Sequence, residues 1–259
     1  MTMPTSIETI NSTKIKPHDN RLLAALPPDV LERLLPDLKP VTLPLGNVIY
    51  ESGVQLKHVY FPVPGCIISM LYVLKDGDSA EIAVVGNEGM VGIALFMGGD
   101  TTPSRAVVQS AGLAFELNGD RLKKEFQRHS GLQHLLLRYT QALITQMTQT
   151  AVCNRHHLVE QQLCRWLLLS LDRLSSNELA MTQELIANML GVRREGVTEA
   201  AGKLQAEGLI NYSRGHIFIL DRQGLEKRVC ECYTVVQKEY ARLLPEKKSA
   251  STSTAILID

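Results

Sequence analysis

Two short amphipathic segments that meet at Gly191 constrain the fold of this chain more than any other feature. Thr182 is a favoured helix N-cap residue, and the apolar residues between Leu185 and Leu190 fall on one helical face. Gly191 accepts the left-handed backbone conformation that ends a helix, and Val192 then fills the turn before a second helix begins near Arg193. The segment therefore predicts two helices joined by a tight turn, which is the pattern of a helix-turn-helix.

The second helix of this pair has an apolar face and a polar face. Its buried positions are predicted to be Val197, Ala200, Ala201 and Leu204. The outer, N-terminal half of such a helix reaches base edges in the DNA major groove. There, Arg194 can bridge O6 and N7 of guanine, and Glu195 can accept a hydrogen bond from the cytosine amino group. The alternative is a helix pair that packs without touching DNA.

A hairpin is predicted directly after the helix pair, from Asn211 to Leu220, with Arg214 and Gly215 at its tip. A hairpin in this position is a wing, whose polar side chains can contact phosphate. The predicted DNA-binding residues are Thr182, Arg193, Arg194, Glu195, Thr198, Glu199, Lys203, Ser213, Arg214 and His216.

The first half of the chain has a different pattern of apolar and turn-forming residues. Between Val41 and Leu117, short apolar runs are separated by Gly, Pro and Asp, which predicts an antiparallel sheet or barrel. The clearest hairpin joins Ile67–Leu74 to Ala80–Val85, because the intervening Asp-Gly pair suits a tight turn. Two short helices are predicted before this module, between Asn20 and Leu38.

A long helix is predicted from about Ser130 to Cys153, followed by a second helix from Leu158 to Leu174. The first would be about 35 Å long, which is more than a small β module needs as cover. We expect its apolar stripe to pack against the same helix of a second copy, although packing against its own domain is the alternative. The predicted dimer contacts are Leu132, Leu136, Tyr139, Leu143 and Met147.

Composition excludes several classes of protein. No apolar run is long enough to cross a bilayer and the N-terminus does not read as a secretory signal, so a cytoplasmic location is expected. The formal net charge is zero, which gives no overall attraction to nucleic acid. No nucleophile elbow, P-loop, dinucleotide fingerprint or metalloprotease motif appears, so no catalytic residue is assigned and an enzyme is not expected.

The five cysteines do not suggest a disulfide framework. Cys230 and Cys232 lie one residue apart, which predicts poor convergence on a metal ion together with the distant Cys153 or Cys164. We therefore expect buried structural thiols and no metal site. The neighbouring His156 and His157 are interpreted as solvated or capping residues at a hinge.

On these motifs the chain resembles the Crp/Fnr family of regulators, from about Leu22 to Leu225. The family's recognition-helix pattern, Ser/Thr-Arg-Glu-Thr-Val-x-Arg, is similar to residues 193–199, where Arg194 and Glu195 match. The resemblance implies a dimer that reads an inverted repeat in double-stranded DNA, with RNA polymerase as a further partner. Glu199 replaces an arginine that contacts DNA in many relatives, so their operator sequence is not carried over.

The resemblance also implies a sensor of the cyclic nucleotide-binding type. Gly92 fits the family's phosphate-binding cassette, but Ile93 stands where a ribose-binding glutamate belongs and Arg105 is one position from the expected arginine. We therefore expect no cofactor, and an unidentified small-molecule effector other than cyclic AMP bound in the usual mode. The candidate ligand residues are Glu88, Gly89, Gly92, Ser104 and Arg105. For the cassette the alternative is an ordinary β-roll loop. For the whole protein the alternative is a cyclic-nucleotide-type regulatory or scaffolding protein without DNA binding.

The predicted fold class is α+β, with an N-terminal antiparallel β-roll, a long dimerisation helix and a C-terminal winged helix-turn-helix. The predicted order is a mobile N-terminus (1–18), a β-roll sensor domain with flanking helices (19–128), the dimerisation helix (129–155), the winged helix-turn-helix domain (156–228), a C-terminal helix (229–244) and a mobile tail (245–259).

Overall fold

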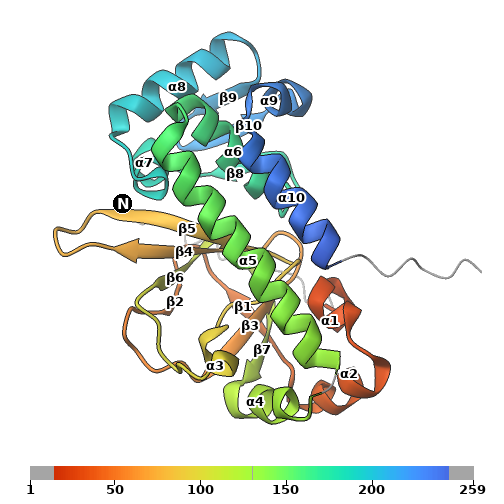
Figure 1. The fold of residues 1–259 in the computed structure, drawn as a ribbon. Coiled ribbons are helices and arrows are strands. Elements are labelled where there is room, and N and C mark those ends of the chain that lie inside the picture. Colours follow the sequence, from red (N-terminus) through yellow and green to blue (C-terminus); the bar gives the residue numbers. More distant parts are fainter. Residues whose placement is uncertain (1–14, 130, 245–259) are drawn as a thin grey trace, which may run out of the picture.

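The computed structural model describes residues 15–129 and 131–244 of the 259-residue chain (Figure 1). The mobile segments expected at residues 1–14 and 245–259 lie outside the described residues. The expected N-terminal segment also includes residues 15–18, of which Pro17 and His18 form a short 3-10 turn with Asp19, η1 (Pro17–Asp19). No helix in the described part of the chain is long and apolar enough to cross a membrane.

Two short helices and a β-roll form the first half of the molecule. The elements are α1 (Arg21–Ala25), α2 (Pro28–Leu34), η2 (Leu35–Asp37), β1 (Lys39–Leu43), β2 (Val48–Tyr50), β3 (His58–Pro62), β4 (Ile67–Val73), β5 (Ser79–Val85), α3 (Ala94–Met97), β6 (Arg105–Ser110), β7 (Gly112–Asn118) and α4 (Gly119–Gln127). Asn20 begins α1, because its side-chain oxygen accepts hydrogen bonds from the N–H groups of Leu22 and Leu23.

The strands form two antiparallel sheets, with orders β1-β7-β3 and β2-β6-β4-β5. The predicted hairpin is confirmed: β4 pairs with β5 from Ile68 opposite Val85 to Val73 opposite Ser79. Apolar side chains from both sheets, from α1 and α2, and from the helix that follows α4 share one core. That core contains fully buried residues such as Val59, Ile68 and Leu117.

Helix α5 (Gly131–His156) runs the length of the molecule, from α4 beneath the β-roll to the C-terminal half (Figure 1). Its apolar stripe packs on the chain's own β-roll. This corrects the predicted dimer contacts, because four of them are fully buried in that core and the fifth packs against its edge: Leu132, Leu136, Tyr139, Leu143 and, at the edge, Met147. Helical spacing reveals that a stripe is buried, but it does not reveal which surface covers it.

The described part of the chain leaves a different line of apolar residues on α5 uncovered. Leu137, Ile144 and Val152 are 52%, 51% and 47% exposed, at intervals of seven and eight residues. Residues at such spacing lie on one face of a helix. This exposed face, rather than the predicted stripe, is free to meet a second copy.

The second half of the chain is a small domain of helices and a three-stranded sheet of order β8-β10-β9. Its elements are α6 (Val159–Leu171), β8 (Glu178–Ala180), α7 (Gln183–Leu190), α8 (Arg194–Ala206), β9 (Ile210–Ser213), β10 (His216–Ile219), α9 (Arg222–Arg228) and α10 (Glu231–Leu243). Helix α10 turns back and packs alongside α5 (Figure 1). The predicted fold class is thus confirmed, with the long helix joining a β-roll to a winged helix-turn-helix.

Glu81 in β5 is a buried carboxyl group between the two halves of the molecule. Burial raises the pKa of Glu81 to about 7, and the Ser69 hydroxyl and the guanidinium groups of Arg165 and Arg173 offset this only in part. One of its carboxyl oxygens has no hydrogen-bond partner in the structure. The folded protein therefore retains a proton that the unfolded chain releases near pH 4.

This carboxyl group predicts a pH-dependent stability. The pKa of Glu81 is higher in the folded protein than in the unfolded chain. Glu81 therefore does not destabilise the folded state at acidic pH, and its destabilising effect grows as the pH rises towards 7. We expect Glu81→Gln to raise the free energy of unfolding by about 2 to 3 kcal/mol at pH 8 and to change it little at pH 4. Urea unfolding at both values measures this, with exposed Glu32→Gln as the control. An equal effect of Glu81→Gln at both values would contradict the assignment.

Candidate nucleic-acid interface and effector cavity

The turn between α7 and α8 is built from local hydrogen bonds. The Thr182 hydroxyl oxygen accepts a hydrogen bond from the N–H of Leu185 at 3.3 Å and so caps α7. Gly191 has a φ of 65°, and its N–H closes the helix on the Ala187 carbonyl. The Val192 N–H donates to the same carbonyl at 3.0 Å. These contacts fix the direction in which α8 leaves the turn.

Helix α8 buries one face and presents the other to solvent. Its buried side chains are Val197, Ala200, Ala201 and Leu204. The residues predicted to contact DNA lie on the exposed face or just before it: Arg193, Arg194, Glu195, Thr198, Glu199 and Lys203. The Thr198 hydroxyl donates to the Gln183 side-chain oxygen at 2.7 Å and joins α8 to α7. The side chains of Thr198 and Gln183 thus lie at the surface between the two helices.

The charged groups on α8 are not equivalent. Lys203 and Glu199 form an exposed ion pair with 2.7 Å between Nζ and Oε1, which lowers the pKa of Glu199 and raises that of Lys203. Arg193 and Arg194 form no ion pair with any carboxylate of the described residues. Arg194 is therefore the cation on α8 that is available to an incoming anion or base.

The wing is the two-residue turn between β9 and β10. Arg214 and Gly215 have φ values of 51° and 81°, both in the left-handed region. Gly215 adopts this conformation freely, whereas an arginine there costs about 1 kcal/mol of strain. His216 lies 2.7 Å from Glu178 on the neighbouring strand β8, and Ser213 is exposed opposite it. The turn holds the Arg214 side chain at the tip of the wing.

The first turn of α7, the start of α8 and the wing border one shallow depression, lined by Thr182, Gln183, Glu184, Arg194, Tyr212, Arg214 and Gly215. Three of the predicted DNA-binding residues, Thr182, Arg194 and Arg214, therefore come together, while Glu199 and Lys203 lie farther along α8. Sequence reasoning missed Gln183 and Tyr212. Gln183 follows the Thr182 cap directly, so its place in the first turn of α7 was the available signal.

A cavity of about 260 Å³ lies inside the β-roll, next to α5. Its lining residues are Tyr50, Leu56, Met70, Tyr72, Ile82, Gly92, Ile93, Ala94, Thr102, Ser104 and Met147. Two of the candidate ligand residues, Gly92 and Ser104, are among them. None of the described residues that line the cavity carries a charge, so no guanidinium or ammonium group faces its interior.

The other candidate ligand residues point elsewhere. Glu88 is buried and forms an ion pair with Arg173 at 2.7 Å, on the side of the β-roll that faces α6. The backbone of Gly89 packs on Tyr139, where a Cβ atom would lie 2.5 Å from the phenol oxygen. Arg105 lies 3.2 Å from Glu51. The five residues thus divide between separate environments.

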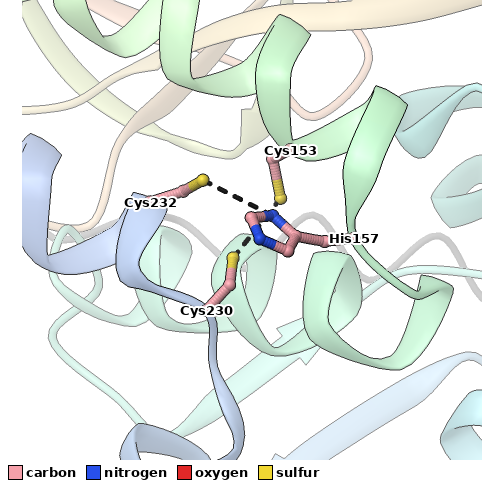
Figure 2. Close-up of side chains that lie close together, drawn as sticks. All are labelled: Cys153, His157, Cys230 and Cys232. Carbon is pink, nitrogen blue, oxygen red and sulfur yellow. Dashed lines mark hydrogen bonds between the residues drawn. The ribbon is translucent and has the colours of Figure 1, made fainter.

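Four potential metal ligands meet where α5 ends and α10 begins (Figure 2). The ligating atoms of Cys153, His157, Cys230 and Cys232 all lie within 4.8 Å of one another. This differs from the expectation that Cys230 and Cys232 do not converge. Cys230 is the N-cap of α10 and Cys232 lies in its first turn, so the chain reverses direction there and both thiols face α5.

Comparison with known protein families matches a domain model to each half of the chain. A sequence model of the Crp-like helix-turn-helix domain matches residues 161–228, and a model of the cyclic nucleotide-binding domain matches residues 40–129. No curated protein was found to match the chain. The two domain matches follow the chain order of the β-roll and the helix-turn-helix.

Solved structures share the whole arrangement. A transcriptional regulator of the Crp/Fnr family from Eubacterium rectale aligns with a TM-score of 0.62 and 19% identity, over 82% of this chain and 98% of its own. A regulator of the CRP family from Thermus thermophilus gives 0.60 and 18%, over 73% and 95%. The regulator CLP from Xanthomonas campestris, described as responsive to c-di-GMP, gives 0.57 and 19%, over 74% and 98%. At these identities the likeness concerns the fold.

Proposed function

Since this chain belongs to the Crp/Fnr family of transcriptional regulators, we propose that it acts as a homodimer that binds an inverted repeat in double-stranded DNA. The observation that carries the proposal is the exposed depression where Thr182, Arg194 and Arg214 meet. Arg194 has no carboxylate partner among the described residues and lies next to a capped helix start and a wing, an arrangement that suits the edge of a DNA groove.

Each part of this surface has a distinct role in the proposal. Helix α8 enters the major groove with its N-terminal half, and Arg194 donates two hydrogen bonds to one guanine. Arg214, whose left-handed backbone holds it at the wing tip, contacts phosphate. Glu195 and Thr198 face bases beside Arg194. The more peripheral contacts, to phosphate, come from Thr182, Arg193, Lys203, Ser213 and His216.

The dimer is built on the exposed face of α5. Leu137, Ile144 and Val152 form an exposed apolar line that residues 15–129 and 131–244 leave uncovered. Two copies of α5 that pack along this line would place two recognition helices on successive half-sites about one DNA turn apart. RNA polymerase is the protein partner expected for a transcriptional regulator that binds in this way.

The β-roll cavity is the proposed effector site. A cyclic nucleotide carries a phosphate, which needs a cationic or N–H-rich site, and none of the described residues that line this cavity is charged. The aromatic and aliphatic lining favours a small uncharged molecule that hydrogen bonds to Ser104 or Thr102. Met147 of α5 forms part of the wall, so a ligand in the cavity touches the helix that carries the dimer face.

The test is selection from randomised duplex DNA followed by affinity measurements on the enriched sequence. We expect an inverted repeat. Arg194→Ala should weaken binding to this sequence by about 10- to 100-fold and remove the preference at one base pair in each half-site. Arg214→Asn should weaken binding to all sequences alike. It should also reduce the slope of log Kd against log salt concentration by about 0.9 for each half-site, because one phosphate contact is lost there.

Three outcomes distinguish the alternatives. Enrichment of an inverted repeat in which Arg194→Ala removes the preference at one base pair of each half-site supports the sequence-specific dimer. No enriched motif, with or without cell extract to supply an effector, would favour a scaffolding protein that does not bind DNA. Cyclic AMP should leave the affinity unchanged, and an affinity that rises with cyclic AMP would contradict the proposed effector class.

A further inference from the structure

The strongest unassigned feature of the molecule is the cluster of Cys153, His157, Cys230 and Cys232 (Figure 2). The sulfur atoms of Cys153 and Cys230 are 3.5 Å apart, and the Cys232 sulfur lies 3.6 Å from Nδ1 of His157. All three thiols are buried, and the His157 ring is largely covered. None of these residues belongs to the DNA-binding surface or the effector cavity.

The spacing of these atoms matches one tetrahedral ion. Zinc lies about 2.3 Å from a thiolate sulfur and about 2.0 to 2.1 Å from an imidazole nitrogen, so neighbouring ligand atoms are separated by about 3.5 to 3.8 Å. The Cys153–Cys230 and Cys232–His157 separations of 3.5 and 3.6 Å lie close to these edges, and the ligand atoms of the other pairs lie within 4.8 Å of one another. An iron-sulfur cluster distributes its thiolates over several irons and needs them farther apart than the 4.8 Å limit found here.

A second observation supports the ligand role of His157. Its Nδ1 atom points into the cluster towards Cys232, while Nε2 lies 3.5 Å from a carboxylate oxygen of Glu231. Histidines that bind metals commonly donate their second ring N–H to a carboxylate, which fixes the tautomer and the orientation of the ring. Glu231 is therefore placed as the outer partner that makes Nδ1 the metal-binding atom.

The surroundings suit the charge of a bound ion. Three thiolates and one neutral imidazole around a divalent cation leave one net negative charge. The buried Arg165 guanidinium donates to Thr150 at 3.0 Å, forms no ion pair with a carboxylate in residues 15–129 and 131–244, and lies within electrostatic reach of Cys153. Its positive charge would offset the negative charge of the loaded site.

We propose that Cys153, His157, Cys230 and Cys232 bind one zinc ion as a Cys₃His site that ties the start of α10 to the end of α5. All four ligands come from the protein, which is typical of a structural zinc site rather than a catalytic one. The site lies beside the junction between α5 and α6, where the β-roll and dimer helix give way to the DNA-binding domain. The bound ion fixes α10, and with it the DNA-binding domain, against the long helix.

The experiment is metal analysis of the full chain purified under thiol reductant without added chelator. We expect about one zinc per chain, and less than a tenth of that in Cys230→Ser and in His157→Ala. Cys164→Ser is the matched control, because Cys164 is an equally buried thiol outside the cluster and should leave the zinc content unchanged. Cobalt added to the metal-free protein should give the visible absorption of a tetrahedral thiolate site, absent from Cys230→Ser.

A second measurement uses the wild-type protein, so its result does not depend on whether the variants fold. A thiol-reactive dye should label few cysteines of the zinc-loaded protein, and a zinc chelator should expose three additional reactive thiols. Wild-type protein that lacks zinc, does not take up cobalt and shows the same dye reaction with and without chelator would overturn the proposal. A Cys153–Cys230 disulfide found by mass spectrometry in protein kept under thiol reductant would also overturn it.

Discussion

Replacing Ile144 with glutamate is expected to convert the dimer into a monomer and to weaken binding to the inverted repeat by about 100-fold or more. Ile144 is 51% exposed at the centre of the uncovered face of α5, so the substitution leaves the chain's own core intact. In a symmetric dimer the two carboxylates would face each other across the helix pair, where burial without a partner is costly. A monomer reads one half-site and loses the avidity of the second, which is about 100-fold or more.

Light scattering coupled to size-exclusion chromatography gives the mass, and fluorescence anisotropy with the selected operator gives the Kd. Met97→Glu is the matched control, because Met97 is 59% exposed in α3, away from α5, and should change neither quantity. The thermal unfolding of both variants should begin near that of the wild type at low protein concentration. A dimeric Ile144→Glu variant with unchanged affinity would show that α5 pairs through another surface.

The helix-turn-helix could be predicted from sequence because its signals are local. Thr182 caps its own helix and Gly191 ends it, and both act within one turn of the chain. The hairpin of β4 and β5 was predictable for the same reason, since its turn residues lie between the strands that they join. In each case the residues that determine the conformation are neighbours in sequence.

The features that the sequence did not predict depend on contacts between distant segments. The stripe of α5 is apolar in sequence, but only the packed structure shows that the β-roll covers it and that Ile144 stays free. Glu88 resembled a ligand residue in a glycine-rich loop, yet Arg173, far along the chain, holds it on another side of the β-roll. Cys153 and Cys230 meet only because α10 folds back along α5.

The ion pair of Glu88 and Arg173 is a buried charged contact that joins the sensor half to the DNA-binding half. Arg173 follows α6, and its Nη2 atom lies 2.7 Å from the Glu88 carboxylate in the β-roll loop. The same guanidinium donates to the Leu169 carbonyl at 2.5 Å, and the backbone carbonyl of Arg173 accepts a hydrogen bond from the Gly65 N–H. Both side chains are buried, so each charge depends on the other.

We expect Arg173→Met to lower the free energy of unfolding by about 3 to 5 kcal/mol, because it leaves the Glu88 carboxylate buried without a cation. The double variant Glu88→Gln/Arg173→Met should recover much of this loss, since a neutral amide is less costly to bury than an unpaired charge. Urea unfolding measures both. Arg242→Met is the control, because Arg242 and Glu239 form an exposed pair on α10 that solvent screens, so its loss should change the free energy of unfolding little.

The position of the pair also predicts how the Arg173→Met variant unfolds. Without this contact, the two halves are still held together by the packing of α7 on β5 and by Ile67, Leu71 and Val84, which share a core with the DNA-binding domain. We expect this weakened interface to separate first, so that the two halves unfold in separate steps rather than in one. Calorimetry should then resolve two transitions in Arg173→Met and one in the wild type. Equal destabilisation by Arg173→Met and by the double variant, with a single transition in each, would show that Arg173 stabilises the protein by packing and not by its charge.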